Sequence, residues 1–246
     1  MLRAFAVLEQ IAGADAPPTL ETLTRACQLP KPTVHRILAV LTRGGLVQRD
    51  AFDRRYAVGP RTAELALAVQ RQSPARAERH AILARLVHEI GETCNFTMPD
   101  GDEVVYLDRV ETAANVRLHM DVGSRVPMHC TASGKLFLAH LPPARVRRLL
   151  GSGPLKRYTA RTVASIEALE RELGKIRASG IGIDSGEFLE ESVCLAVPVL
   201  DARARLCAAI AVHGPAPRMT LRKGYSFLPA MRRAAREISA TFAAAT

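Results

Sequence analysis

The stretch TLETLTRACQLPKPTVHRILAVLTRGGLVQRDAFDRRYAV, residues 19–58, decides the fold of the N-terminal part of this 246-residue chain. The spacing of its apolar residues and the positions of Thr, Pro and Gly predict four pieces. In order, these are a short helix after Thr19, a turn over 27–30, a helix over 31–43 that ends at Gly44-Gly45, and a hairpin over 46–58. An amphipathic helix over 2–12 precedes them, with Leu2, Phe5, Leu8 and Ile11 at steps of three. Three helices followed by a hairpin are typical of a winged helix-turn-helix.

A helical wheel of residues 31–43 separates an apolar side from a polar row. The apolar side consists of Val34, Ile37, Leu38 and Leu41, and the opposite row of Pro32, Arg36, Ala39 and Arg43, flanked by Thr33 and His35. Small residues in that row allow close approach to base edges, and Arg36 can fork onto O6 and N7 of a guanine. Thr33 and the N–H groups of the first turn suit a phosphate. The predicted DNA contacts are therefore Lys31, Pro32, Thr33, His35, Arg36, Ala39 and Arg43, with Arg54 and Arg55 at the tip of the hairpin.

The formal net charge of +10 favours a polyanionic partner without specifying one. Residues 1–59 hold eight Lys or Arg and five Asp or Glu, a net charge of only +3. The order of helix, turn, helix and hairpin therefore supports DNA binding more strongly than charge does. Two alternatives stay open: Arg36 and Arg43 as ordinary solvated side chains, and a metabolite sensor whose hairpin domain contacts another protein.

The remainder of the chain mixes helical and strand-like segments. A helix over 61–71 is predicted as a linker, and Ser73-Pro74 as the cap and first residue of the next helix. The segments that follow are a helix to Ile90, a strand-rich region over 94–119, helices over 131–140, 143–150 and 162–179, strands over 181–187, 194–200 and 205–213, and a helix over 225–243. This order predicts an α+β domain.

Cysteine usage and hydropathy indicate the compartment. Five cysteines stand at positions 27, 94, 130, 194 and 207, without a C-x-x-C pair. An odd number at these spacings argues against a disulfide framework and for a reducing environment. No apolar run reaches the roughly 18 residues of a membrane span, and the N-terminus lacks a signal-peptide core. We therefore expect a cytoplasmic protein.

Three sharper chemistries fit the sequence poorly. Ser133-Gly134-Lys135 is not a Walker phosphate loop, because the glycine that the pattern needs five residues before Gly134 is His129. No G-x-S-x-G hydrolase motif is present. Suitable metal ligands are His119, Asp121, His129 and Cys130, but their spacing matches no zinc framework. We predict no catalytic residue, no metal and no cofactor; an enzyme derived from a metabolite sensor is the remaining alternative.

Motifs in order along nearly the whole chain resemble the IclR family of bacterial transcriptional regulators. They are Leu29–Leu38, Arg55–Pro60, Gly91–Asn95, Val104–Val110, Val122–His129, Ala132–Lys135 and Ile210–Pro215. The resemblance implies a winged helix-turn-helix domain over 1–59, a linker helix over 60–73, and a GAF-like α+β effector-binding and oligomerisation domain over 74–246. It also implies homodimers or homotetramers that bind partly palindromic operators in double-stranded DNA and respond to small organic or aromatic acids. A dimer is needed if two recognition helices are to read successive major grooves.

The resemblance further places an effector pocket. Its residues are Ala132, Ser133, Asp184, Cys194, Ala211 and His213, to which we add Met120 and Met128 as an adaptable apolar wall. Ala132 and Ser133 open a helix whose N–H groups favour a carboxylate. Family members that bind short keto acids carry small hydroxyl residues where this chain has Ala211 and His213, and His213 is a larger, titratable donor.

That departure favours a hydroxylated or aromatic acid over a short keto acid. Asp184 would repel a carboxylate, so we expect it to accept a hydrogen bond from a ligand hydroxyl. Plainer alternatives stay open, namely a core Cys194, a His213 that only caps a strand, and a simple turn at Asp184-Ser185-Gly186.

Overall fold

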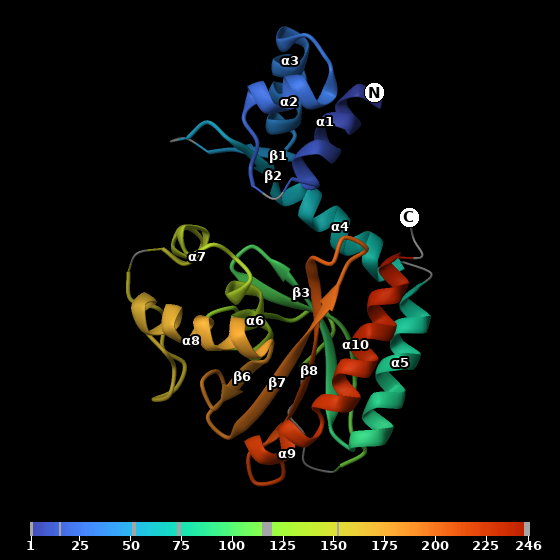
Figure 1. Ribbon diagram of the computed structural model, residues 1–246, viewed down its shortest axis with the longest axis vertical. Coiled ribbons are helices and arrows are strands. Elements are labelled where there is room, and N and C mark those ends of the chain that lie inside the picture. The colour runs from blue at the N-terminus through green and yellow to red at the C-terminus, as the bar shows by residue number, and fades with distance from the viewer. Residues whose placement is uncertain are drawn as a thin grey trace. The chain divides into compact units, whose positions relative to one another are not determined.

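The chain divides into two compact units, Met1–Ser73 and Pro74–Thr246, in the computed structural model shown in Figure 1. The structure describes residues 2–14, 16–50, 53–72, 75–114, 120–151 and 153–243. The expected N-terminal winged helix-turn-helix and C-terminal α+β domain are both confirmed. The predicted cap at Ser73-Pro74 lies outside the described residues.

The N-terminal unit is a small helical bundle with a two-stranded hairpin. Its elements are α1 (Leu2–Ala12), α2 (Leu20–Cys27), α3 (Lys31–Arg43), β1 (Val47–Arg49), β2 (Tyr56–Val58) and α4 (Pro60–Gln72). Their core consists of Val7, Ile11, Leu23, Val34, Leu38, Leu41, Val47 and Tyr56. The stripe predicted on α1 is partly wrong, because Leu2 and Phe5 are exposed and Val7 takes the buried position.

Local chemistry explains where these elements begin and end. Thr19 caps α2 as predicted, since its Oγ1 accepts from the N–H of Thr22 at 3.2 Å. Gln28 ends α2 in the left-handed region with φ of +52°. At the base of the hairpin, a Cβ on Gly59 would lie 2.3 Å from the carbonyl oxygen of Gly45. Only glycine therefore allows the chain to leave β2 at this point.

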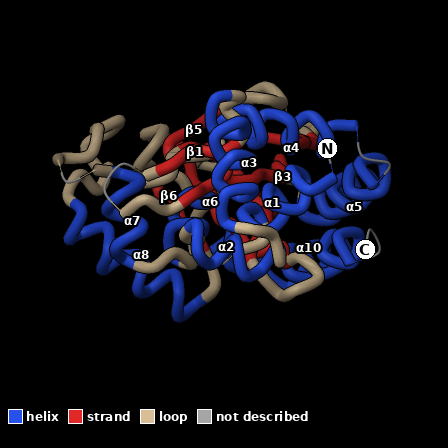
Figure 2. The backbone as a smooth tube through the Cα atoms, turned by 90° about the horizontal axis from the view of Figure 1, so that it is seen from above, coloured by secondary structure: helices blue, strands red, loops and turns tan. Residues whose placement is uncertain are grey.

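The C-terminal unit contains a six-stranded antiparallel sheet in the order β5-β4-β3-β8-β7-β6. The strands are β3 (Thr93–Asp100), β4 (Glu103–Val110), β5 (Arg125–Pro127), β6 (Gly182–Ser185), β7 (Ser192–Leu200) and β8 (Leu206–Pro215), and the helices are α5 (Ala75–Ile90), α6 (Ala132–Ala139), α7 (Pro143–Leu150), α8 (Ile166–Ser179), α9 (Leu221–Ser226) and α10 (Leu228–Ala243). Helices α5 and α10 lie side by side and pack on the central strands (Figures 1 and 2). Helix α6 packs on the sheet, mainly against β6 and β7, and α8 packs against α6.

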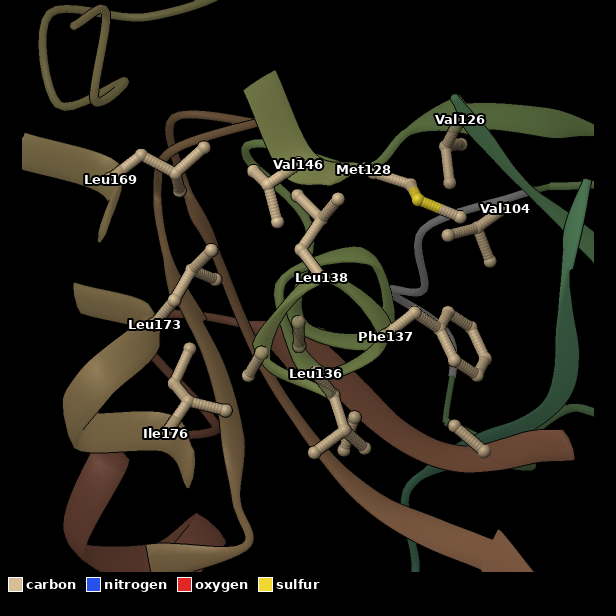
Figure 3. Close-up of a cluster of buried hydrophobic side chains, with 14 of the residues drawn as sticks. Val104, Val126, Met128, Leu136, Phe137, Leu138, Val146, Leu169, Leu173 and Ile176 are labelled. Atoms are coloured by element: carbon tan, nitrogen blue, oxygen red, sulfur yellow. The ribbon is translucent and has the colours of Figure 1, made fainter. Parts of the chain in front are cut away.

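Helix α6 is the centre of the second core, and all eight of its residues are buried. Figure 3 shows Leu136, Phe137 and Leu138 pointing outward from this helix in different directions, with α8 contributing Leu169, Leu173 and Ile176. A Cβ on Gly134 would lie 2.3 Å from the Cα of Met128, so α6 touches the preceding segment backbone to backbone. This contact fixes the position of the N-terminus of α6.

Several predicted bounds differ from the structure. The helix predicted over 162–179 begins at Ile166, because Ser165 caps it by accepting from the N–H of Ala168 at 3.3 Å. The predicted final helix is two helices, α9 and α10, and the short strand β5 was not predicted. Strand β4 ends at Val110, before the end of the strand-rich region predicted over 94–119. Residues 115–119 of that region lie outside the described residues.

Candidate functional site

The predicted reading row of α3 faces solvent. Arg36, Ala39 and Arg43 are exposed, whereas Val34 and Leu38 on the opposite side are in the core. Lys31, Pro32 and His35 are also exposed, and Thr33 is half-buried. The structure therefore brings these seven side chains together along one helix, as a surface of basic and small residues that suits a DNA groove.

The first turn of α3 is less open to a phosphate than the sequence suggested. The N–H of Thr33 donates to the carbonyl oxygen of Pro30 at 2.8 Å, and the N–H of Val34 reaches the same oxygen at 3.1 Å. Pro32 has no N–H to offer. The N–H groups of Thr33 and Val34 are therefore already used within the helix, and we expect the side chains of Lys31 and Thr33 to contribute most to a phosphate site at this end.

The two hairpin arginines are in different states. Arg54 is exposed and has a φ of +54°, so it stands at a sharp turn. Arg55 turns back, since its Nη1 donates to the carbonyl oxygen of Pro17 at 3.1 Å and its Nε lies 3.4 Å from Asp53 Oδ2. Arg54 therefore suits a DNA contact better than Arg55. Residues 51–52 of the hairpin lie outside the described residues.

A small cavity in the C-terminal unit collects most of the predicted effector residues. Its lining consists of Val104, Tyr106, Met120, Val126, Thr131, Ala132, Ser133, Asp184, Phe188, Leu189, Ser192, Cys194, Ala211 and His213. The cavity volume is about 20 Å³, which is room for roughly one water molecule. Of the eight predicted residues only Met128 is absent from the lining. Its side chain is 2% exposed and packs in the core near Val126 (Figure 3).

The N-terminus of α6 provides the positive end of the cavity. Its N-cap residue, Thr131, makes no side-chain cap, because its Oγ1 donates instead to the carbonyl oxygen of Pro127 at 2.7 Å. The Oγ of Ser133 accepts from Thr97 Oγ1 at 3.0 Å, which leaves the Ser133 proton to donate elsewhere. An uncapped helix start with an extra hydroxyl donor favours a carboxylate.

Asp184 holds a segment, Glu187 to Leu189, that contributes to the cavity lining. Its Oδ1 accepts from the N–H of Glu187 at 2.7 Å and from that of Phe188 at 3.4 Å. Burial raises the pKa of Asp184 to about 7, against the effect of these two bonds. The turn that the sequence left as an alternative is therefore present, and the same carboxyl group also lines the cavity.

His213 is a neutral ring in this site. Its Nε2 lies 3.2 Å from Nη1 of Arg109. A guanidinium group can only donate, so Nε2 accepts and the ring proton is on Nδ1. Burial, helped by the Arg109 charge, lowers the pKa of His213 to about 3. The prediction that His213 titrates near neutral pH is therefore wrong. The ring stays uncharged there and donates only through Nδ1–H.

The sequence reasoning missed hydroxyl groups that replace those absent at positions 211 and 213. Tyr106, Thr131 and Ser192 all line the cavity. Burial raises the pKa of the Tyr106 phenol, so that it remains a hydrogen-bond donor. Alternation along β4 puts Tyr106 and Val104 on one face, a signal that was available but did not show which face lines a cavity.

The metal hypothesis gains no support from the described residues. His129 Nε2 bonds to the carbonyl oxygen of Lys156 at 2.9 Å. Among the residues that the structure describes, no group of three His, Cys, Asp or Glu side chains is arranged to hold a metal ion. His119 lies outside them. None of the described helices is long and apolar enough to cross a membrane.

Comparisons with known proteins agree with this layout. The family model described as "Bacterial transcriptional regulator IclR C-terminal" matches residues 68–240, and the "IclR helix-turn-helix domain" model matches residues 2–51. A Cupriavidus necator protein, "Probable transcriptional regulator SauR", is 49% identical over 98% of this chain and 96% of its own length.

Two solved structures are also similar. The Thermotoga maritima IclR crystal structure gives a TM-score of 0.65 at 28% identity and covers 98% of both chains. The inducer-binding domain of PobR from Acinetobacter, a double mutant in complex with 3-hydroxybenzoic acid, gives 0.62 at 25% identity, with 66% of this chain and 96% of that chain covered. With two family models spanning both units, the chain belongs to the IclR family of bacterial transcriptional regulators.

Proposed function

We propose that this regulator binds a partly palindromic operator through α3 and changes its DNA affinity when a small organic acid enters the cavity beside α6. The exposed row of Arg36, Ala39 and Arg43 is the observation that carries the first half of the proposal. We assign DNA binding to residues 1–59, a linker to 60–73, which contains α4, and effector binding and oligomerisation to 74–246. Two copies of α3 are needed to read two half-sites, so the active species is a homodimer or a tetramer.

DNA footprinting tests the first half directly. Purified protein is titrated against the DNA that flanks its own gene, at two salt concentrations. We expect a protected palindrome whose affinity falls as salt rises, because basic side chains displace counterions from phosphates. If no site is protected at either salt concentration, the DNA-binding proposal is wrong.

The second half rests on the uncapped N-terminus of α6 in the cavity wall. A carboxylate placed there would meet the helix dipole and the Ser133 hydroxyl. The cavity, at about 20 Å³, is smaller than any such acid, so binding requires lining side chains to move outward. The acid bound to the similar PobR domain supports the ligand class, and a hydroxylated or aromatic acid is the narrower form of the proposal.

A thermal-shift panel tests the ligand class. Propionate, malonate, benzoate and 3-hydroxybenzoate are added separately to the full chain, with sodium chloride at equal ionic strength as the control. An acid that binds the folded state raises the melting temperature in a concentration-dependent way. If all four acids match the salt control, the acid-effector proposal fails.

A further inference from the structure

Asn95, Arg109 and His213 form a polar cluster on the sheet, and one of its members, His213, lines the cavity. Asn95 on β3 pairs with Arg109 on β4 and with Ala211 on β8. Residues two apart on a strand share a face, so Asn95 lies on the face that carries Ala211 and His213. Both of these β8 residues line the cavity. The cluster is therefore next to the effector cavity and is separate from the N-terminus of α6.

Arg109 fixes which atoms of its two neighbours face outward. Its Nη1 donates to Asn95 Oδ1 at 2.9 Å and lies 3.2 Å from His213 Nε2. Because a guanidinium cannot accept, this geometry sets both the amide orientation of Asn95 and the tautomer of His213. The groups left over are two donors, the Asn95 Nδ2 amide and the His213 Nδ1–H.

The Asn95 amide carries an unsatisfied donor. Asn95 is fully buried, and its Nδ2 has no hydrogen-bond partner among the described residues. Buried polar groups are nearly always paired, so an orphan donor next to a cavity is available to a group that enters the cavity. The side chain of Arg109 is 4% exposed, and its positive charge is shared with Glu111 at 3.1 Å. The surroundings therefore favour an acceptor oxygen, and more so an anionic one.

We propose that Asn95 and His213 form a second subsite of the effector cavity and bind an acceptor oxygen at the far end of a small bifunctional acid. This inference rests on the proposed function, in which the first carboxylate of the acid binds at the N-terminus of α6. Arg109 is a positioning residue that presents the two donors. The ligand class is a small acid that carries a second acceptor oxygen. We expect tighter binding when that oxygen belongs to a second carboxylate.

Calorimetry with malonate and propionate, which differ by one carboxylate, tests the second subsite in the full chain. We expect malonate to bind about tenfold more tightly, as for one extra satisfied hydrogen bond. Asn95→Asp keeps the acceptor for Arg109 but replaces the Nδ2 donor, so it should abolish that preference and leave propionate binding within about twofold. His213→Phe should act in the same direction, and it keeps the inference testable if Asn95→Asp does not fold. Asp100→Asn, a charge change at the other end of β3, is the matched control and should preserve the preference.

The outcomes separate the two proposals. Equal binding of malonate and propionate to the unmodified chain, or an unchanged preference in folded Asn95→Asp and His213→Phe, overturns the second subsite alone. Binding of neither acid overturns the second subsite, and the acid-effector proposal fails with it only if benzoate and 3-hydroxybenzoate also match the salt control. Nitrogen-15 NMR of the histidine rings adds a direct readout, with the His213 signal assigned from its absence in His213→Phe. We expect a single Nδ1–H tautomer that is lost in Arg109→Met, and an Nε2–H ring in the unmodified protein would overturn the geometry.

Discussion

Lys135 on α6 forms a buried ion pair with Glu187, whose Oε1 contacts its Nζ. Lys135 is fully buried, and a second carboxylate, Glu172, lies 3.5 Å from the same nitrogen. Glu187 directly precedes Phe188 and Leu189, which line the cavity. The pair thus links the lining segment that contains Phe188 and Leu189 to α6, the helix at whose N-terminus we propose that the effector carboxylate binds.

Breaking this pair should destabilise the C-terminal unit. Lys135→Met leaves Glu187 buried without its cation, and we expect a loss of about 3–5 kcal/mol in the free energy of unfolding. Chemical denaturation measures this, with the exposed Lys175→Met on α8 as control. The double variant Lys135→Met/Glu187→Leu should recover part of the loss. A single variant as stable as the control would show that the pair contributes little.

The raised pKa of Asp184 predicts a pH effect on stability. Because the pKa of Asp184 in the folded protein, about 7, exceeds the ordinary value of an aspartate, the folded state binds this proton more tightly than the unfolded state does. The contribution of Asp184 to the free energy of unfolding therefore falls as pH rises from about 4 to 7, by at most about 1.4 kcal/mol per unit. Two charged neighbours affect the pKa of Asp184: Glu187 raises it and Lys135 lowers it.

Denaturation of the unmodified chain and of Asp184→Asn between pH 5 and 8 isolates this contribution, because the amide still accepts the bond from Glu187. The lowered pKa of His213 acts with the opposite sign, since stability falls as pH drops below its ordinary value of 6.5 towards 3. That effect is common to both proteins and cancels in the comparison. Parallel pH curves for the two proteins would contradict the raised pKa.

Two glycines in helices give a matched pair of substitutions. Gly134→Ala would place a Cβ against the backbone of Met128, so we expect a loss of at least about 1–3 kcal/mol from overpacking. Gly174→Ala on α8 meets open space and should stabilise the fold by up to about 1 kcal/mol. Thermal melts of both variants test this. Equal melting temperatures would show that α6 can move away from Met128.

Arg36 should contribute to sequence recognition. We expect Arg36→Ala to weaken operator binding by about 1–3 kcal/mol, as for the loss of a base contact. Arg25→Ala is the control, because this arginine is exposed on α2 and its Nη2 lies 3.6 Å from Glu21 Oε1 of the same helix. Anisotropy titrations with labelled operator DNA compare the two. If both variants bind like the unmodified chain, Arg36 does not read the operator.

The helical period correctly predicted which face of α3 is exposed, because the other face packs with Val7 and Leu23 in the core. Predictions for the cavity were less complete. Met128 was misplaced because its side chain packs in the core cluster with Val104 of β4 and residues of α8, which are distant in sequence. Tyr106 was missed because strand alternation gives two faces without saying which one borders a cavity. The tautomer of His213 depends on Arg109, which lies 104 residues away in sequence.

The central claim is that acid binding in the C-terminal unit is coupled to DNA binding by α3. The most direct test is the dissociation constant of the footprinted operator, measured with and without saturating malonate at constant ionic strength. We expect a change of about 5–150-fold, the usual range of allosteric coupling. An operator affinity that stays the same at malonate concentrations shown by calorimetry to saturate the protein would contradict it.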